Sequence, residues 1–243
     1  FDNYIYIFEG CLSSEGGLCL TFKTYLSTFF FCFFTWLITL VLGFCVAYFL
    51  AFYVNSIPLQ VCLFLVCTIP FWTSNVIRMV SWIPLLGRNG LVNEFFLSLG
   101  IIDQPIEWLL YSSFSVILAL VHLYTLFMIV PIFNSMIRID RSIVEAAYDA
   151  GASHRQIIFN IIIPLSKTGI IIGSIFVVTV VMGDFLTIGI MGGQQLASVG
   201  KIINTEMNYL QFPGAAANAV ILLIITIFII YVMTKFIDIR KEL

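Results

Sequence analysis

A long stretch without any charged side chain sets the strongest limit on how this chain can fold. No Asp, Glu, Lys or Arg occurs between Lys23 and Arg78. A helix needs about 20 apolar residues to cross the hydrocarbon core of a bilayer, so this interval has room for two spans. Over the whole chain only 10% of residues are charged and 61% are hydrophobic, whereas soluble domains carry about 25% charge. We therefore expect an all-helical integral membrane protein.

Five apolar segments, separated by Pro, Gly and Asn turn signals, are long enough to be membrane helices. Pro70 is expected to kink the second of them. A polar and aromatic loop over 83–112 follows it and is expected to contain a short surface helix at 91–99. The predicted spans are residues 26–53, 59–82, 113–133, 169–190 and 214–234.

The basic residues orient these spans. Most of them lie in the segment 138–168 and in the C-terminal tail, whereas the segments on the other side of the spans contain only Lys23, Arg88 and Lys201. Because cytoplasmic loops carry an excess of Lys and Arg, we place 138–168 and the tail in the cytoplasm. The opposite segments are acidic. Either they attract a cationic solute, or they are acidic because the bases were retained inside.

The segment 138–168 is the one long charged stretch between two predicted spans. Gly151 supplies the left-handed residue that ends a short helix. A second helix can then run to Pro164, so we expect a rigid helical hairpin at the membrane surface. Capping-box spacing marks the start of both helices, in the pairs Ser142 with Glu145 and Ser153 with Gln156.

This hairpin resembles the EAA signature found in the cytoplasmic loop of permease subunits of binding-protein-dependent ABC importers. The signature reads EAA, three residues, Gly, nine residues, Ile, one residue and Leu-Pro, and the sequence departs from it at Ile163, where Leu is usual. The resemblance implies the type I (MetI-like) importer permease fold and a hairpin that contacts an ATPase. The residues implied in that contact are Glu145, Ala146, Ala147, Gly151, Ala152, Ile161 and Pro164.

Three further stretches, 70–73, 90–94 and 191–193, are similar to permeases of spermidine/putrescine uptake systems. The resemblance implies a bacterial inner-membrane permease with a second permease subunit, two cytoplasmic ATP-binding subunits and an extracytoplasmic solute-binding protein as partners. ATP and Mg²⁺ then belong to the ATPase subunits, and this lipid-embedded chain carries no catalytic residue, metal or cofactor. Family members usually have one more span before the external loop, so we expect that first helix to be absent here. The net charge of −2 argues against a nucleic-acid partner.

Asp184 is the sharpest candidate for a residue of the substrate pathway. At about 1.5 Å per residue from Gly169 it lies roughly 22 Å along its helix, toward the outer part of a core about 30 Å thick. An ionisable group at that depth indicates function, here neutralisation of a cationic substrate or closure of an outer gate. The alternative is a carboxylate that caps a broken helix at the water boundary. Trp72 and Tyr124 can offer ring faces to ammonium groups. The alternatives are that the polar band at Trp72 serves helix packing and that Tyr124 is a core residue.

Several alternatives stay open at this point. One alternative is the same machine with another cargo, namely a sugar, an opine, a thiamine-like cation or ferric iron. The other is a different class, a secondary transporter or a membrane enzyme subunit. A secondary carrier would show inverted repeats and coupling-ion sites, and none is evident in the sequence. His122 is expected to be a packed, hydrogen-bonded residue, and Arg78 to extend to the membrane interface. Cys11 and Cys19 are both expected outside, where they can pair.

Overall fold

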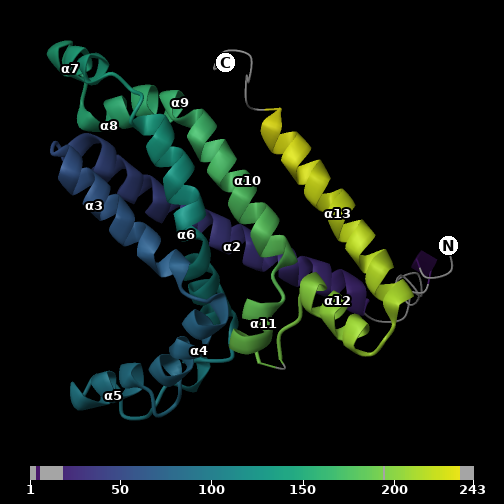
Figure 1. Ribbon diagram of the computed structural model, residues 1–243. Helices are drawn as coiled ribbons and strands as arrows, with labels where there is room; N and C mark the ends of the chain where they lie inside the picture. The colour runs from purple at the N-terminus through teal and green to yellow at the C-terminus, as the bar shows by residue number, and fades with distance from the viewer. Residues whose placement is uncertain (1–3, 6–18, 194, 236–243) are drawn as a thin grey trace. The chain divides into compact units, whose positions relative to one another are not determined.

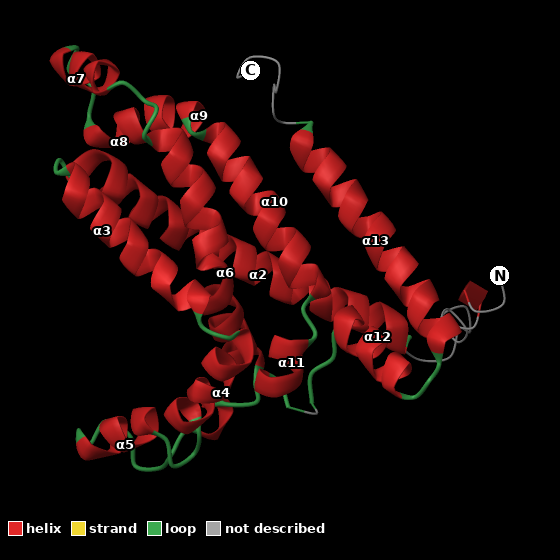
Figure 2. Ribbon diagram, viewed as in Figure 1, coloured by secondary structure: helices red, strands yellow, loops and turns green. Residues whose placement is uncertain are grey.

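The computed structural model describes residues 4–5, 19–193 and 195–235, and all regular structure there is helical (Figures 1 and 2). The longer elements are α2 (Leu20–Tyr48), α3 (Ile57–Thr68), α4 (Asn75–Leu86), α5 (Leu91–Ser98), α6 (Ser113–Met136), α7 (Arg141–Asp149), α10 (Lys167–Gly183), α12 (Val199–Asn208) and α13 (Phe212–Thr234). The shorter ones are η1 (Phe49–Tyr53), η2 (Ile69–Trp72), η3 (Glu107–Leu109), α8 (His154–Ile157), η4 (Ile158–Ile162), α9 (Ile163–Leu165) and α11 (Leu186–Met191).

Among the described residues, three helical segments are long and apolar enough to cross a membrane, and the number rises to five if each of two broken pairs counts as one span. The three are Thr21–Tyr53, Ser113–Met136 and Phe212–Thr234, which overlap the first, third and fifth predicted spans. The broken pairs overlap the second and fourth.

The second predicted span, 59–82, is not one continuous helix. Its first part ends in the 3₁₀ turn η2, which contains Pro70, and α4 begins only after a break at Thr73 and Ser74. Proline removes one backbone N–H and disfavours the helical conformation of the residue before it, so a break near Pro70 follows from the sequence. What the sequence did not reveal is that α4 then continues to Leu86, through Pro84.

The chain divides into two compact units. Unit 1 comprises 1–35, 73–123 and 178–228, and unit 2 comprises 36–72, 124–177 and 229–243. The break before α4 coincides with a boundary between the units.

In unit 2, α6 is packed closely against two other helices through glycines. A side-chain carbon at Gly43 of α2 would lie 2.7 Å from Met128 Cγ, and one at Gly173 of α10 would lie 2.8 Å from Met128 Sδ. Met128 and Ile132 of α6 are fully buried. The small residues allow the helix backbones to approach, which is the usual way that membrane helices associate.

In unit 1, Asn93 organises the loop around α5. Its amide group donates to the carbonyl oxygens of Gly87 (3.0 Å) and Ile106 (3.1 Å), and its Oδ1 accepts from Ile106 N (2.8 Å). The side chain is completely buried. The predicted surface helix 91–99 is therefore present as α5 and is fixed by one buried amide.

Two expectations for polar residues of unit 1 had different outcomes. Arg78 does not extend to an interface: its side chain is only 8% exposed and donates to Asn75 Oδ1, so that prediction was wrong. His122 is hydrogen-bonded as expected, because Trp82 Nε1 donates to its Nδ1 at 3.2 Å. Nothing in the sequence indicated that Trp82 of α4 would be the partner of His122 in α6.

The cysteines behave mainly as apolar side chains. Cys32, Cys45, Cys62 and Cys67 are free thiols, and Cys19 is in a disulfide. Cys11, which was expected to be able to pair with Cys19, lies outside the described residues, and so do residues 236–243 of the basic C-terminal tail.

Candidate functional site

The first helix of the hairpin, α7, begins two residues earlier than the capping pattern predicts. Asp140, not Ser142, is the N-cap, and its carboxylate accepts a hydrogen bond from Ser142 N at 3.0 Å. The predicted capping box of Ser142 and Glu145 was therefore wrong, because the backbone donor of Ser142 is already used by Asp140. This hydrogen bond lowers the pKa of Asp140, so the stability that the charged cap contributes is lost only as the pH falls through that lowered value.

Gly151 ends α7 in the left-handed conformation, as predicted. Its φ is +83°, and two backbone hydrogen bonds close the turn: Gly151 N to Tyr148 O at 2.9 Å and Ala152 N to Ala147 O at 3.0 Å. This pair of bonds is the Schellman arrangement, which satisfies the last carbonyl groups of a helix.

The second arm begins with the capping box expected at Ser153. Ser153 N donates to Gln156 Oε1 at 2.8 Å, and Gln156 N donates to Ser153 Oγ at 3.4 Å. The helix continues through the π-helical turn η4 and through α9 to Leu165, past Pro164. Ile157 and Ile162 are buried and anchor this arm, whereas Ile161 is half-buried.

Polar and aromatic contacts hold the hairpin to the rest of unit 2. Tyr148 OH and His154 Nδ1 are 2.8 Å apart and join the two arms. The His154 ring also lies 6.1 Å from the ring of Tyr48 in α2. The Arg141 guanidinium donates to Asn55 Oδ1 at 2.6 Å and to Ala51 O at 3.3 Å, so the start of α7 is attached to the end of η1 and the turn that follows it.

The outer surface of α7 remains available to another molecule. No residue of α7 is buried, and Ile143 and Tyr148 are 45% and 48% exposed. Glu145 and Ala146 are exposed, and Ala147 is half-buried. A short helix fixed at its base, with small and apolar residues on its surface, is suited to insertion into a groove of a partner.

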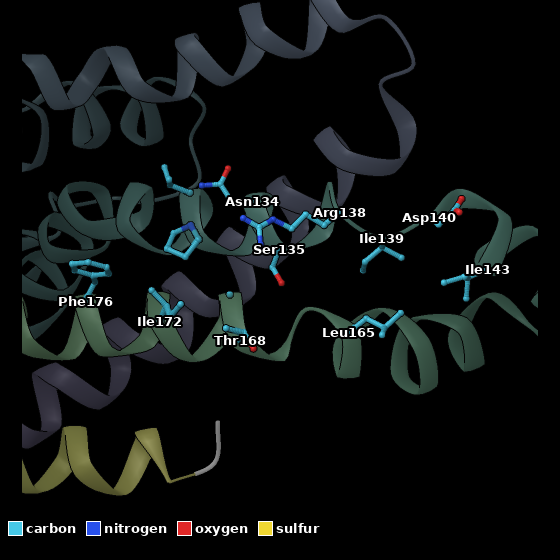
Figure 3. Close-up of a pocket in the computed structure, with 13 residues that line it drawn as sticks. Asn134, Ser135, Arg138, Ile139, Asp140, Ile143, Leu165, Thr168, Ile172 and Phe176 are labelled. Atoms are coloured by element: carbon cyan, nitrogen blue, oxygen red, sulfur yellow. The ribbon is translucent and has the colours of Figure 1, made fainter. Parts of the chain in front are cut away.

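A groove of about 670 Å³ lies beside the hairpin, within unit 2 (Figure 3). Its walls are the last turns of α6, the connection to α7, and the first turns of α10. Figure 3 shows the Arg138 side chain extending toward Asn134 and Ser135, with Phe176 and Ile172 toward one end of the groove. The other lining residues are Val130, Pro131, Ile139, Asp140, Ile143, Leu165, Thr168 and Gly169.

The two aromatic candidates for the substrate pathway occupy different environments in unit 2. Trp72 ends η2 and is 84% exposed, whereas Tyr124 of α6 is only 7% exposed. Tyr124 belongs to an aromatic cluster centred on Phe127, whose ring lies 6.1 Å from Tyr124, 5.5 Å from Phe71 and 6.4 Å from Phe176. Within unit 2 it is Phe71 rather than its neighbour Trp72 that reaches this cluster.

Asp184, the third candidate, belongs to unit 1 and lies where α10 stops and α11 starts. Its Oδ1 accepts from Thr187 N at 2.9 Å, and Thr187 Oγ1 donates to Oδ2. Asp184 is half-buried and Thr187 is fully buried. This is the capping geometry offered as the alternative interpretation, and it leaves the role of the charge in transport as a prediction.

No cluster of His, Cys, Asp and Glu that could hold a metal ion occurs among the described residues. The contacts that sequence reasoning missed are those of Arg141, Tyr148 and His154, which position the hairpin. In the sequence Arg141 is one of the basic residues of 138–168 that indicate the orientation of the spans. Nothing in the sequence indicates that the uncharged turn at Asn55 lies beside it.

Comparison with known proteins gives a consistent result. Residues 25–242 match the family described as "Binding-protein-dependent transport system inner membrane component". The chain is 38% identical over 188 residues to the spermidine/putrescine transport system permease protein PotB of Escherichia coli (strain K12), a match that covers 76% of this chain and 67% of that protein. It is 34% identical over 185 residues to PotB of Haemophilus influenzae, covering 74% and 64%.

A solved structure shares the fold. The chain superposes with a TM-score of 0.74 on a permease chain in the crystal structure of a bacterial alginate ABC transporter in complex with an alginate pentasaccharide-bound periplasmic protein. The superposition covers 96% of this chain and 85% of that one, at 13% sequence identity. At that identity the likeness concerns the fold alone.

Proposed function

The chain belongs to the family of binding-protein-dependent transport system inner membrane components, and we propose that the solute it moves through the bacterial inner membrane is a polyamine of the spermidine or putrescine type. The permease fold and the multi-pass membrane location predicted from the sequence are confirmed by family membership and by the structural likeness. The chain is a permease subunit of an ABC importer, and its relatives are transport proteins. A secondary transporter is excluded by the family.

One observation carries the choice of cargo: the similarity to two polyamine permeases extends over about three quarters of the chain, at 34–38% identity. The chemistry of the chain agrees with it. A polyamine carries two or more ammonium groups, which favour carboxylates and aromatic faces. The chain supplies Asp184, the exposed Trp72 and the cluster around Phe127 as candidate contacts. Sugars, opines, thiamine-like cations and ferric iron have no comparable support.

In this transport the chain would act through mechanical contact with its partners rather than through ATP hydrolysis. ATP would be hydrolysed by two cytoplasmic ATPase subunits, and a second permease subunit and an external solute-binding protein would complete the importer. The exposed surface of α7, with Glu145, Ala146 and Ala147, would insert into the ATPases, together with the turn at Gly151 and Ala152. Closure of the ATPases on ATP would then displace the hairpin as one body.

The contacts of the hairpin define where such a displacement would go. Arg141 would carry it to the turn at Asn55 and to Ala51 of η1, the segment that follows α2, through its hydrogen bonds to both. Ile157 and Ile162, which are buried on the second arm, would carry it toward α10. A change at the membrane surface would thereby alter the spans, which is the requirement for alternating access.

Uptake of labelled spermidine and putrescine tests the cargo. Cells that express this chain with its partner subunits should accumulate at least one of the amines in an ATP-dependent manner, and cells that lack this chain should not. Cysteine substitution at Ala152 tests the contact, with the native free cysteines replaced first. A cross-link from Ala152→Cys to an ATPase subunit is the expected result. Absence of uptake for both amines removes the cargo assignment, and absence of any cross-link removes the coupling assignment.

A further inference from the structure

The groove beside the hairpin lies where two membrane spans reach the same surface. The span α6 ends at Met136, and α10 begins at Lys167. The lining residues therefore change character with depth. Asp140 and Arg138 lie beyond the end of α6, Asn134 and Thr168 lie at the ends of the two helices, and Ile172 and Phe176 lie one to three turns inside α10.

Arg138 and Asp140 are the charged residues that line the groove, and the Asp140 carboxylate accepts a hydrogen bond from Ser142 N at the start of α7 rather than pairing with Arg138. The Arg138 side chain is exposed and forms no ion pair or hydrogen bond with any described residue. Figure 3 shows it extending into the groove beside Asn134 and Ser135. A guanidinium group presents a planar set of donors that matches a phosphate, and basic pockets between spans on the cytoplasmic side are suited to lipid head groups.

The apolar end of the groove fits a hydrocarbon chain. Ile172 and Phe176 are 38% and 50% exposed, although they lie within a membrane span, and Val130 and Pro131 of α6 form the opposite wall. A free phosphate ion would use only the polar end. A phospholipid would use both ends, in the order in which they occur along the membrane normal.

We propose that this groove is a binding site for one phospholipid of the cytoplasmic leaflet. Arg138 holds the phosphate, the polar side chains of Asn134 and Ser135 lie beside the glycerol and ester groups, and one acyl chain lies along Ile172 and Phe176. The leaflet follows from the orientation used in the proposed function, but the site itself does not depend on the cargo. Because Asp140 both lines the groove and caps α7, the bound lipid is adjacent to the start of the coupling hairpin.

The Arg138 side chain argues against the cargo as the occupant, because it extends along the groove toward Asn134 and Ser135, whereas the Asp140 carboxylate is bonded to Ser142 N. A polyamine would be repelled by Arg138, whereas an anionic phosphate diester is attracted to it. The partner permease and the ATPases are the remaining candidate occupants, and both are proteins. A direct test can therefore separate a lipid from a protein in this position.

The test uses the assembled importer, purified in detergent from cells that express all of its subunits, with phosphatidylglycerol as the probe. Native mass spectrometry of the wild-type complex should show retained phosphatidylglycerol. Arg138→Gln should weaken that retention about tenfold or more, since one charge-assisted contact is removed. Lys167→Gln is the matched control: it removes a base at the same membrane surface that does not line the groove, and it should change retention less than about twofold. Neither measurement requires ATP or cargo, so failed polyamine uptake would leave this result unaffected.

Three outcomes would overturn the proposal. Equal losses for Arg138→Gln and Lys167→Gln would show general attraction to the membrane surface. Competition by inorganic phosphate would show a site for the anion alone. A photoreactive benzophenone at Ile172, introduced by cysteine labelling, should give a product with the mass of a phospholipid, and a product with the partner permease or an ATPase would show that protein covers the groove.

Discussion

Replacement of Gly151 tests whether the conformation of one residue sets the shape of the coupling hairpin. Gly151 has φ +83°, and a side-chain carbon built there has no heavy atom of the described chain within 4 Å. Gly151→Ala therefore introduces no clash, and its whole cost is the left-handed backbone, about 1–2 kcal/mol. That cost corresponds to a factor of about 5–30 in the equilibrium between the closed and opened turn. Gly151→Asn is the matched control, because Asn adopts this conformation more readily than Ala.

Hydrogen exchange measures this cost in the membrane complex. The amide of Ala152 donates to Ala147 O across the turn, so its protection reports the opening of the hairpin. We expect protection and ATP-driven uptake to fall in the order wild type, Gly151→Asn, Gly151→Ala, with a loss of protection of about 5–30-fold for Ala. The reasoning would be refuted if Asn, the larger residue, were worse than Ala, because steric contact rather than backbone conformation would then be responsible.

Three further predictions concern the hydrogen bonds of the hairpin, the carboxylate and the orientation. Arg141→Met and Asn55→Leu should each lower uptake, and the double variant should be no worse than Arg141→Met alone, since that change already removes the hydrogen bond to Asn55 together with the one to Ala51 O; additive losses would contradict a shared role. Asp184→Asn keeps an oxygen that accepts from Thr187 N but removes the charge, so a strong loss of polyamine uptake with unchanged assembly assigns the charge to transport, and normal uptake assigns Asp184 to capping alone. An impermeant thiol reagent should label Ser98→Cys in intact cells and Ser153→Cys only after the cells are opened; the reverse would invert the topology.

Much of the fold could be predicted from the sequence, because the length of an apolar segment and the turn residues that bound it determine a membrane helix locally. The spans at 113–133 and 214–234 and the surface helix at 91–99 correspond to α6, α13 and α5. The breaks inside two predicted spans, after Trp72 in 59–82 and after Gly183 in 169–190, were harder to place. Pro70 and Gly183 mark their positions, but whether a helix kinks or stops depends on the contacts that its ends make, as the hydrogen bonds of Asp184 with Thr187 illustrate.

Side-chain partners far apart in the sequence could not be predicted from it. Arg141 and Asn55 are 86 positions apart, and Trp82 and His122 are 40 apart. Hydrogen bonds between residues close in the sequence were easier to predict, since the capping box at Ser153 follows from its three-residue spacing to Gln156. Where two local patterns competed, as at the start of α7, the sequence did not decide between them. The prediction for Arg78 was wrong for a related reason. Arginine side chains generally extend to water, but that of Arg78 instead donates to the nearby Asn75 Oδ1.

The hairpin separates residues that build its shape from residues that face outward. Arg141, Tyr148, His154 and the buried Ile157 hold it in place, yet none of them belongs to the EAA signature. Glu145, at the head of the signature, is exposed and forms no hydrogen bond or ion pair with any described residue. An exposed signature residue with no such partner is the kind of residue expected to contact another molecule, which is the role proposed for Glu145. Gly151 is the exception, because its left-handed backbone conformation sets the direction of α7, and in the proposed mechanism this rigid turn would convert a partner's motion into a displacement of the spans.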